Sequence, residues 1–335
     1  MNDAAPVTLE SIVFYAPERE VSARDLAELE VLPIARREHA RALGIDTVRV
    51  AAELDHEVDL AHAAAAQLLQ ESGIDASELD ALVMVQGRAP HYLLASEATR
   101  LQHRLGAHRA FTTTVGDLGC VSVSAALTMA AALLRGEPRF RFVLVVAAAK
   151  SPTRARYRPP MTLLGDGAAA VLLTTSGRGR YELVDQIVRS DGRYADLFRI
   201  DYRTAHEQEW VEECADEPTY SFKLAVDSRS RFTRLNSELL ERNGIGSVDT
   251  VLMQNLSVGA FAFWEEALDL EIDPVCRRAL AAYGHLGSVD ILLDLEYAAA
   301  TQDPGALCLV LNSSPVAAWS SALLRRVPDL DTQDR

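Results

Sequence analysis

Three residues of this 335-residue chain carry side chains that together could transfer an acyl group: Cys120, His285 and Asp290. Cys120 follows a Gly-x-Leu-Gly turn in GDLGCVSVSAAL, and the small apolar residues after it predict a buried helix. The free N–H groups and the dipole at a helix start stabilise a thiolate, so we expect a low pKa for Cys120. The same N–H groups could hold the oxyanion of a tetrahedral intermediate. Cys120 is therefore the candidate nucleophile.

His285 and Asp290 lie in a second turn of the same pattern, GHLGSVDILLDL. His285 precedes the predicted helix and Asp290 lies in its first turn, so the carboxylate can orient the imidazole as a general base. Each residue also has an ordinary interpretation. The cysteine could be a small core residue, the histidine a cap or a solvated side chain, and the aspartate a helix cap. Their placement on matched turns favours a joint Cys–His–Asp set.

The two turns belong to a longer internal repeat. The segments 68–86 and 239–254 both predict a helix end, a glycine (Gly73 or Gly244) and a buried strand. Segments 141–149 and 306–314 are both apolar strand-like runs, and all three pairs recur in the same order at nearly constant spacing. Any αβ protein repeats helix–turn–strand units, which is the alternative explanation. We favour a duplication that brings the two matched helix starts together in the middle of the molecule.

The duplication predicts two halves, 1–178 carrying Cys120 and 179–335 carrying His285 and Asp290. Each half is read as strand, helix, strand, helix, strand, and the polar stretch 191–220 as an excursion on the surface. One segment tests the repeat: RRALAAY at 277–283 favours a helix by propensity, whereas its partner 109–115 favours a strand. A true repeat requires a buried strand at 277–283, and a helix there would count against it.

Composition narrows the class of protein. The net charge of −15 argues against a nucleic-acid binder. The cysteines form no CxxC or Cys/His cluster, so we expect neither a metal site nor a disulfide framework. We see no signal peptide and no run of 18 uninterrupted apolar residues. These features predict a soluble cytoplasmic protein that does not span a membrane.

With these residues identified, the chain resembles the ketoacyl-acyl-carrier-protein synthase III family over nearly its whole length. The resemblance rests on DLGCVSVSAAL around the cysteine, on GDGA at 165–168 followed by AAVLLTT, and on NSSPVAAWSSALL at 312–324. It implies an α/β thiolase fold, five-layer αβαβα and built from two duplicated halves. It also implies a homodimer.

The departures from the family pattern concern the residues that condense. Condensing members carry a His-Gln-Ala-Asn run where this chain has Met253-Gln254-Asn255-Leu256, and their Gly-Asn turn is Gly284-His285 here. Decarboxylative condensation uses that His and Asn together to hold an enolate oxygen. A cysteine with one histidine and a following aspartate instead resembles a divergent branch of antibiotic biosynthesis. That branch includes acyltransferases acting on hydroxyl or amino acceptors and some polyketide starter-unit ketosynthases.

The loop that usually forms the oxyanion hole is also altered. Ser314-Pro315-Val316 stands where glycines are typical, and Pro315 has no N–H to donate. We expect the N–H groups of Val316 and Cys120 to form the hole. Asn255 could assist, or its amide could satisfy backbone groups at the end of a buried strand.

The resemblance implies an acyl thioester donor, either an acyl carrier protein or coenzyme A, and no further cofactor. We expect transfer through a Cys120 thioester to a hydroxyl or amine acceptor. The alternatives are a priming ketosynthase that forms a carbon–carbon bond and a non-catalytic partner subunit, which would not need Cys120. Two groups of arginines could meet a phosphopantetheine phosphate or an acidic carrier, with solvated surface charge as the alternative: Arg154, Arg156 and Arg158, or Arg229, Arg231 and Arg234.

Overall fold

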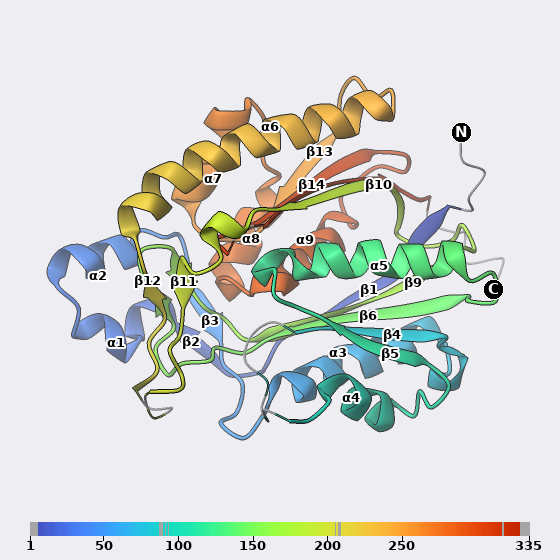
Figure 1. Cartoon of the computed structure of the whole chain (residues 1–335), viewed down its shortest axis with the longest axis horizontal. Coiled ribbons are helices and arrows are strands. Elements are labelled where there is room, and N and C mark those ends of the chain that lie inside the picture. The colour runs from blue at the N-terminus through green and yellow to red at the C-terminus, as the bar shows by residue number, and fades with distance from the viewer. Residues whose placement is uncertain are drawn as a thin grey trace.

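The computed structural model describes residues 6–86, 90, 92, 94–204, 206, 209–316 and 318–328. The nine strands of the main sheet form two layers, which alternate with three layers of helices (Figure 1). Helices α6 (Ala225–Arg242) and α7 (Val258–Leu268) cover the outer face of one strand layer. Helices α3 (Glu57–Ser72) and α4 (Glu97–Leu105) cover the outer face of the other. Between the strand layers lie α5 (Ser122–Gly136), α8 (Pro274–Tyr283) and α9 (Asp290–Ala298). The expected five-layer αβαβα thiolase fold is confirmed.

The first half of the chain contributes one strand layer and the helices on both of its faces. In order, its elements are β1 (Val7–Tyr15), β2 (Glu20–Ser22), α1 (Ala27–Glu30), α2 (Ile34–Arg41), β3 (Thr47–Arg49), α3 (Glu57–Ser72), β4 (Ala81–Val85), α4 (Glu97–Leu105), β5 (Phe111–Val115), α5 (Ser122–Gly136), β6 (Phe142–Ala149), β7 (Tyr157–Arg158), β8 (Thr162–Leu163) and β9 (Gly167–Thr174).

The second half follows a similar order. Its elements are β10 (Tyr181–Ser190), β11 (Phe198–Arg199), β12 (Glu213–Cys214), α6 (Ala225–Arg242), β13 (Thr250–Met253), α7 (Val258–Leu268), α8 (Pro274–Tyr283), α9 (Asp290–Ala298), β14 (Leu307–Ser314) and β15 (Ala318–Arg326). The expected division after residue 178 falls in the link between β9 and β10, and as a domain boundary it stays a prediction.

The strands join in the order β13-β14-β15-β10-β1-β9-β6-β4-β5. Strands β1 and β10 pair over three residues only, Val7 to Leu9 with Leu183 to Tyr181, so the five-stranded and four-stranded parts separate beyond this seam. Pairing is parallel between β4 and its neighbours β5 and β6, and between β13 and β14. The remaining pairs are antiparallel. Strand β5 therefore forms one edge and β13 the other.

The matched Gly-x-Leu-Gly turns have the same backbone geometry. Each leads into a short 3₁₀ turn, η3 (Gly119–Val121) before α5 and η7 (Gly287–Val289) before α9. Leu118 has φ −104° and ψ 14°, and Leu286 has φ −105° and ψ 16°. Gly119 and Gly287 follow with φ 55° and 62°, in the left-handed region that favours glycine. The repeat thus extends from the sequence to the local conformation.

The expectation of a strand at 277–283 is wrong. This segment lies in α8, which begins at Pro274 with Asp273 as its N-cap, so local propensity and capping override the repeat here. The start of α8 also forms hydrogen bonds with the edge of β13, where the missing strand would have paired. Val251 C=O accepts from Asp273 N–H (2.9 Å), and Met253 N–H donates to Cys276 Sγ (3.5 Å). The outer edge of β13 is therefore covered by α8. This helix counts against the repeat at 277–283, and the halves also differ in the short elements β2, α1, α2, β3, β7 and β8 of the first and β11 and β12 of the second.

One helical stretch, Gly119–Gly136, is long and apolar enough to cross a membrane by length and composition alone. It contains α5, which lies between the two strand layers (Figure 1), and 56% of it is buried inside the protein. A core helix packed on two faces has this composition because both of its faces must be apolar. The stretch is explained by its place in the fold.

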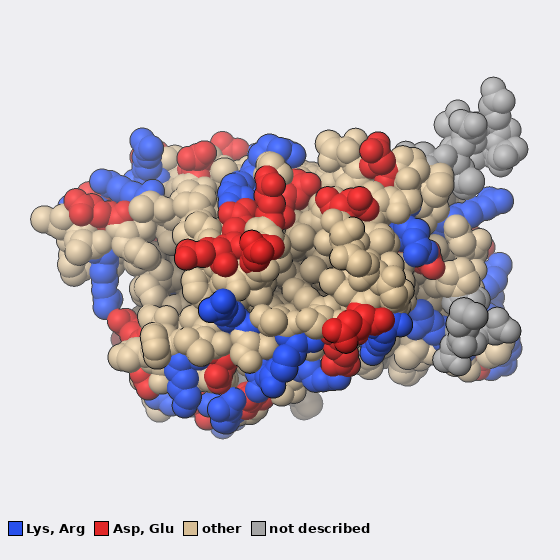
Figure 2. All heavy atoms as spheres, turned by 90° about the horizontal axis from the view of Figure 1, so that it is seen from above, with Lys and Arg blue, Asp and Glu red and all other residues tan. Residues whose placement is uncertain are grey.

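Charge is mixed on the face seen from above in Figure 2, with acidic side chains gathered near its centre and basic ones around them. The whole chain carries a net charge of −15. A partner recognised by charge on this face therefore meets a mixed surface, so electrostatic docking there has to be local.

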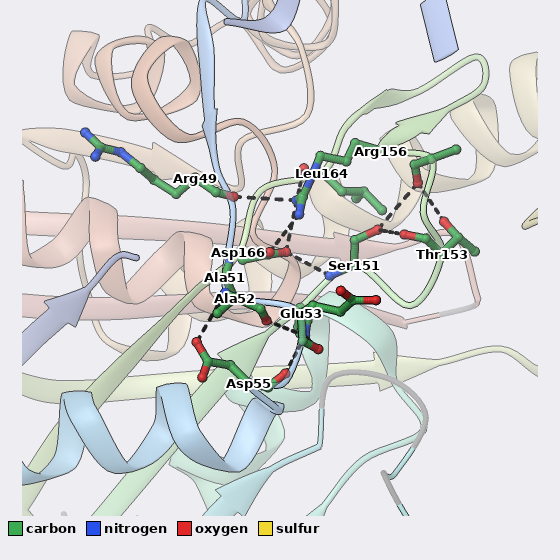
Figure 3. Close-up of polar contacts among 12 residues, drawn as sticks. Arg49, Ala51, Ala52, Glu53, Asp55, Ser151, Thr153, Arg156, Leu164 and Asp166 are labelled. Atoms are coloured by element: carbon green, nitrogen blue, oxygen red, sulfur yellow. Dashed lines mark hydrogen bonds and ion pairs between the residues drawn. The ribbon is translucent and has the colours of Figure 1, made fainter. Parts of the chain in front are cut away.

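The GDGA element builds a buried ion pair that ties three loops together (Figure 3). Asp166 is fully buried, and its two carboxylate oxygens contact the Arg156 guanidinium at 3.0 and 2.7 Å. They also accept from the N–H groups of Ala51 (2.8 Å) and Ser151 (2.9 Å). Four donors satisfy the carboxylate, as burial of a charge requires.

Asp166→Ala should destabilise the protein by about 3–5 kcal/mol, because it leaves the Arg156 guanidinium buried without its carboxylate. Denaturant unfolding followed by circular dichroism measures the change. Asp55→Ala is a matched control, since the Asp55 carboxylate accepts a longer hydrogen bond from Ala52 N–H (3.2 Å) near the surface. Equal stabilities of the two variants would contradict the structural role given to Asp166.

Candidate active site

The two matched turns meet at the centre of the molecule, where η3 and η7 contact each other. Cys120 lies in η3 and is 6% exposed. Gly119 permits the close approach of the loop after β14, because a Cβ at this position would collide with Ser314 Oγ and lie 3.2 Å from Val316 Cγ2. The turn therefore needs glycine for its backbone angle and also for the space it leaves.

The structure brings Cys120, His285 and Asp290 together in a line. Cys120 Sγ lies 3.4 Å from His285 Nε2, and His285 Nδ1 lies 2.6 Å from Asp290 Oδ2. The imidazole can exchange a proton with the thiol through Nε2 while Nδ1 stays bonded to the carboxylate. His285 and Asp290 are buried, at 1% and 0% exposure.

His285 is fixed by the chain just before Asp166. Its N–H donates to Leu163 C=O (2.9 Å) and its C=O accepts from Gly165 N–H (3.1 Å). A Cβ at Gly165 would collide with Tyr283 C=O, and one at Gly284 would lie 2.8 Å from Leu163 C=O. Both glycines are thus required for the two backbones to approach. The GDGA element of one half positions the histidine of the other.

Asp290 is held by backbone donors as well as by the histidine. Oδ1 accepts from Leu286 N–H (2.8 Å), and Oδ2 also accepts from Asn255 N–H (3.0 Å). The Asn255 side chain points to a second buried carboxyl, with Nδ2 3.1 Å from Asp294 Oδ1. Asn255 thus supports Asp290 through its backbone, and its amide is bonded to a side chain rather than to backbone groups.

Charge coupling shifts both members of the Cys–His pair. Burial alone would raise the pKa of Cys120, but the charge and hydrogen bond of His285, with a contribution from Arg158, lower that pKa below its ordinary value. Burial opposes protonation of His285, yet Asp290 and Cys120 raise its pKa to about 9. Both shifts favour a thiolate–imidazolium pair over the neutral thiol and imidazole. His285 adds a cause of thiol acidity that a helix start alone does not supply.

The loop after β14 lies against the thiol. Val316 and Ser314 line the same cavity as Cys120, and Val316 N–H donates to Ser314 Oγ over a long 3.3 Å bond. The sequence did not identify Asn312, whose Nδ2 donates to Cys120 C=O (2.8 Å) and to Ser124 Oγ (3.3 Å). Asn312 fixes the backbone that carries the nucleophile. No sequence signal separated it from an ordinary strand residue.

Met253 stands where the resemblance places a condensing histidine. It is 1% exposed, and its backbone N–H is bonded to Cys276. A thioether cannot donate a hydrogen bond to an oxyanion. Positions 253 and 285 correspond to the His and Asn of condensing members. Of the two side chains present here, only that of His285 can donate a hydrogen bond.

Two cavities meet at Ser314 and Pro315. One, of about 500 Å³, is lined by Cys120, Gly119 and Ser288 among others. The second, of about 340 Å³, is lined mainly by apolar side chains that include Met161, Leu224 and Trp264. Cys120 thus borders the first cavity, and the shared loop borders both.

The segment 191–220 is more than a surface excursion. Phe198 and Arg199 of β11, together with Tyr202, Trp210 and Glu212, form one wall of the larger cavity. Residues 205, 207 and 208 of this segment lie outside the described residues. The sequence did not indicate this role, because the stretch is mostly polar and its aromatic residues follow no regular spacing.

Several of the arginines considered as docking residues are engaged inside the protein. Arg156 pairs with Asp166, Arg158 with Glu212, and Arg231 with Asp191. Arg231 also lies over the Trp319 ring, at 4.6 Å from its centroid, and Arg229 Nε donates to Ala267 C=O (3.0 Å). Arg154 and Arg234 are exposed. Neither group is simply solvated surface charge.

Iodoacetamide should alkylate Cys120 first at neutral pH, at a rate that falls only below the lowered pKa of this thiol. Burial raises the pKa of Cys308 to about 12, and it raises the pKa of Cys276 and Cys214 as well. His285→Ala removes the charge and hydrogen bond that lower the pKa of Cys120 against the effect of burial. The pH dependence of alkylation should therefore shift to higher pH. Peptide mass spectrometry across a pH series measures both effects. Preferential labelling of another cysteine, or an unchanged profile in His285→Ala, would contradict the coupled pair.

Comparisons with known proteins agree with the fold. Residues 117–192 match the family model of 3-oxoacyl-acyl-carrier-protein synthase III. The β-ketoacyl-acyl-carrier-protein synthase III of Oleidesulfovibrio alaskensis is 30% identical over 299 residues, which cover 84% of this chain and 88% of that protein. That of Campylobacter jejuni strain RM1221 is 24% identical over 325 residues, covering 95% and 97%.

Solved structures give the same fold at lower identity. The acyltransferase ChlB3 superposes with a TM-score of 0.80 at 22% identity, covering 97% of this chain and 98% of that one. AbyA1, described as a tetronic acid condensing enzyme, gives a TM-score of 0.76 at 22% identity, covering 95% and 99%. Together with the relative that is 30% identical over most of both chains, these matches show that the protein belongs to the ketoacyl-acyl-carrier-protein synthase III family of enzymes.

Proposed function

We propose that this protein is an acyltransferase that moves an acyl group from a carrier or coenzyme A thioester, through Cys120, to a hydroxyl or amine acceptor. The observation that carries the proposal is the Cys120–His285–Asp290 line, in which His285 contacts both the thiol and a buried carboxylate. This is the arrangement of a nucleophile with an oriented general base. We assign the roles of nucleophile to Cys120, base to His285 and orienting group to Asp290.

Loading follows from the charge state of the pair. The Cys120 thiolate attacks the thioester carbonyl, and a new carbon–sulfur bond forms as the bond to the donor sulfur breaks. His285 gives its Nε2 proton to the departing thiolate. The N–H groups of Cys120 and Val316 are proposed to hold the oxyanion, and the Val316 N–H exchanges its long bond to Ser314 Oγ for the oxyanion. The imidazole is left neutral beside an acyl-enzyme.

Transfer then uses the neutral imidazole. An acceptor hydroxyl or amine attacks the acyl-enzyme, and His285 Nε2 takes its proton while Asp290 stabilises the imidazolium. Cys120 leaves as a thiolate, which restores the starting ion pair. Proton and charge balance across the two steps without any further group.

The two cavities share the loop at Ser314 and Pro315, and Cys120 borders the larger of them. We propose that the mainly apolar 340 Å³ cavity takes the donor's phosphopantetheine arm and that the 500 Å³ cavity takes the acyl group. An acidic carrier would have to dock locally, since the chain is itself acidic. We also propose a homodimer in secondary-metabolite biosynthesis, as the family resemblance implies, and a cytoplasmic location, as the composition predicts.

His285→Ala should separate the two half-reactions. Loading should slow at neutral pH, because the charge that stabilises the thiolate is gone, and recover at higher pH as the thiolate forms unaided. Transfer should stay lower by about 10²- to 10⁴-fold, the usual loss of a general base, so acyl-enzyme accumulates. Asp290→Asn should act in the same direction, because it leaves the ring in the wrong tautomer. Intact-mass spectrometry follows loading and chromatography follows the product.

Malonyl carrier offered as an extender should release no CO₂, because Met253 cannot donate a hydrogen bond to an enolate. An ester or amide product formed without CO₂ supports the transferase. Stoichiometric CO₂ with a β-keto product would overturn it in favour of a priming ketosynthase. Absence of any acyl adduct on Cys120 with a broad panel of thioesters would favour a non-catalytic subunit.

A further inference from the structure

A charged pair lies in the wall of the cavity that borders Cys120. The Arg158 guanidinium contacts the Glu212 carboxylate, and the two side chains are only 11% and 12% exposed. Both residues line the cavity with Cys120. The positive charge of Arg158 is also felt at the thiol, where it helps to lower the pKa of Cys120. The pair is thus part of the space next to the nucleophile.

Arg158 keeps hydrogen-bonding capacity that the described residues do not use. Arg158 offers five N–H donors, and its planar group lies over the Phe198 ring at 5.1 Å from the centroid. Its Nε is buried and has no hydrogen-bond partner among the described residues. Ser288, on the opposite matched turn, also borders this cavity, and its buried Oγ has no partner among the described residues either.

A plain alkyl chain suits this wall poorly. It would displace water from a carboxylate and a guanidinium without replacing the lost hydrogen bonds, and such desolvation costs free energy. The pair is electrically neutral as a unit, so a second carboxylate would be attracted by Arg158 but repelled by Glu212. A neutral group that both donates and accepts hydrogen bonds can satisfy both partners.

We propose that the Arg158–Glu212 pair selects the acyl group, and that the enzyme loads short acyl groups bearing a neutral hydroxyl or carboxamide in preference to alkyl or carboxylate-bearing ones. This inference rests on the proposed function, because it concerns the group held on Cys120. Phe198, Tyr202 and Trp210 bound the remaining space with aromatic side chains. The cavity volume of about 500 Å³ limits the length of the group that fits.

The test compares initial rates of Cys120 acylation by 3-hydroxybutyryl-, butyryl- and malonyl-coenzyme A, followed by intact-mass spectrometry without any acceptor. We expect the hydroxy substrate to load about 10- to 100-fold faster than butyryl, the range that a hydrogen bond to a charged group provides. The double variant Arg158→Met/Glu212→Met should lose or reverse this preference. Glu212→Gln should raise the malonyl rate relative to the wild type. Arg189→Met/Glu238→Met removes an exposed ion pair that does not line this cavity, so it is the matched control and should keep the preference.

The outcomes separate the inference from the proposed function. If butyryl loads as fast as 3-hydroxybutyryl on the wild type, the inference is overturned while the acyltransferase proposal stands. If the double variant folds, as judged by circular dichroism, and keeps the wild-type preference, Arg158 and Glu212 do not select the acyl group. If no thioester acylates Cys120, both proposals fall. The wild-type comparison decides the inference even where the double variant does not fold.

Discussion

The site depends on a close backbone contact between two distant segments, Leu163 to Gly165 and Gly284 to His285. Two backbone hydrogen bonds join them, and neither glycine position leaves room for a side chain. Asp166, the next residue, is anchored by a fully buried carboxylate whose four donors come from two other loops. The position of His285 therefore depends on an ion pair that lies outside the Cys120–His285–Asp290 line. Loss of the Asp166–Arg156 pair would shift the main chain that holds His285. It would therefore change the position of His285 relative to the Cys120 thiol, not the charge beside that thiol.

Charge within the site is balanced along a single line. Asp290 compensates the imidazolium, the imidazolium compensates the thiolate, and backbone N–H groups of Leu286 and Asn255 fix the terminal carboxylate. Because each charge is buried, each requires the next one. Acylation removes the thiolate charge, which lowers the affinity of His285 for its proton just when the donor's sulfur needs one. The order of the proton transfers follows from this electrostatic coupling.

Much of this arrangement could be predicted from sequence because it is encoded in short turns. The Gly-x-Leu-Gly segments before Cys120 and Ser288 fix local backbone angles, and the duplication predicts that they meet. The strand expected at 277–283 was wrong because Asp273 and Pro274 start a helix whatever the repeat requires. Asn312 and the Arg158–Glu212 pair were missed for a different reason. Their partners lie far away along the chain, and no local pattern encodes a contact between two loops.

Helix α8 has a consequence for how copies of this chain can associate. In the first half β4 has strands on both sides and β5 exposes its outer edge, whereas in the second half α8 occupies the outer edge of β13. Each molecule thus offers a single unpaired strand edge at the ends of its main sheet, among the residues described. Edge-to-edge pairing needs one such edge from each participant, so two molecules that join through β5 consume both. The sheet can double in this way, but it cannot propagate into a filament.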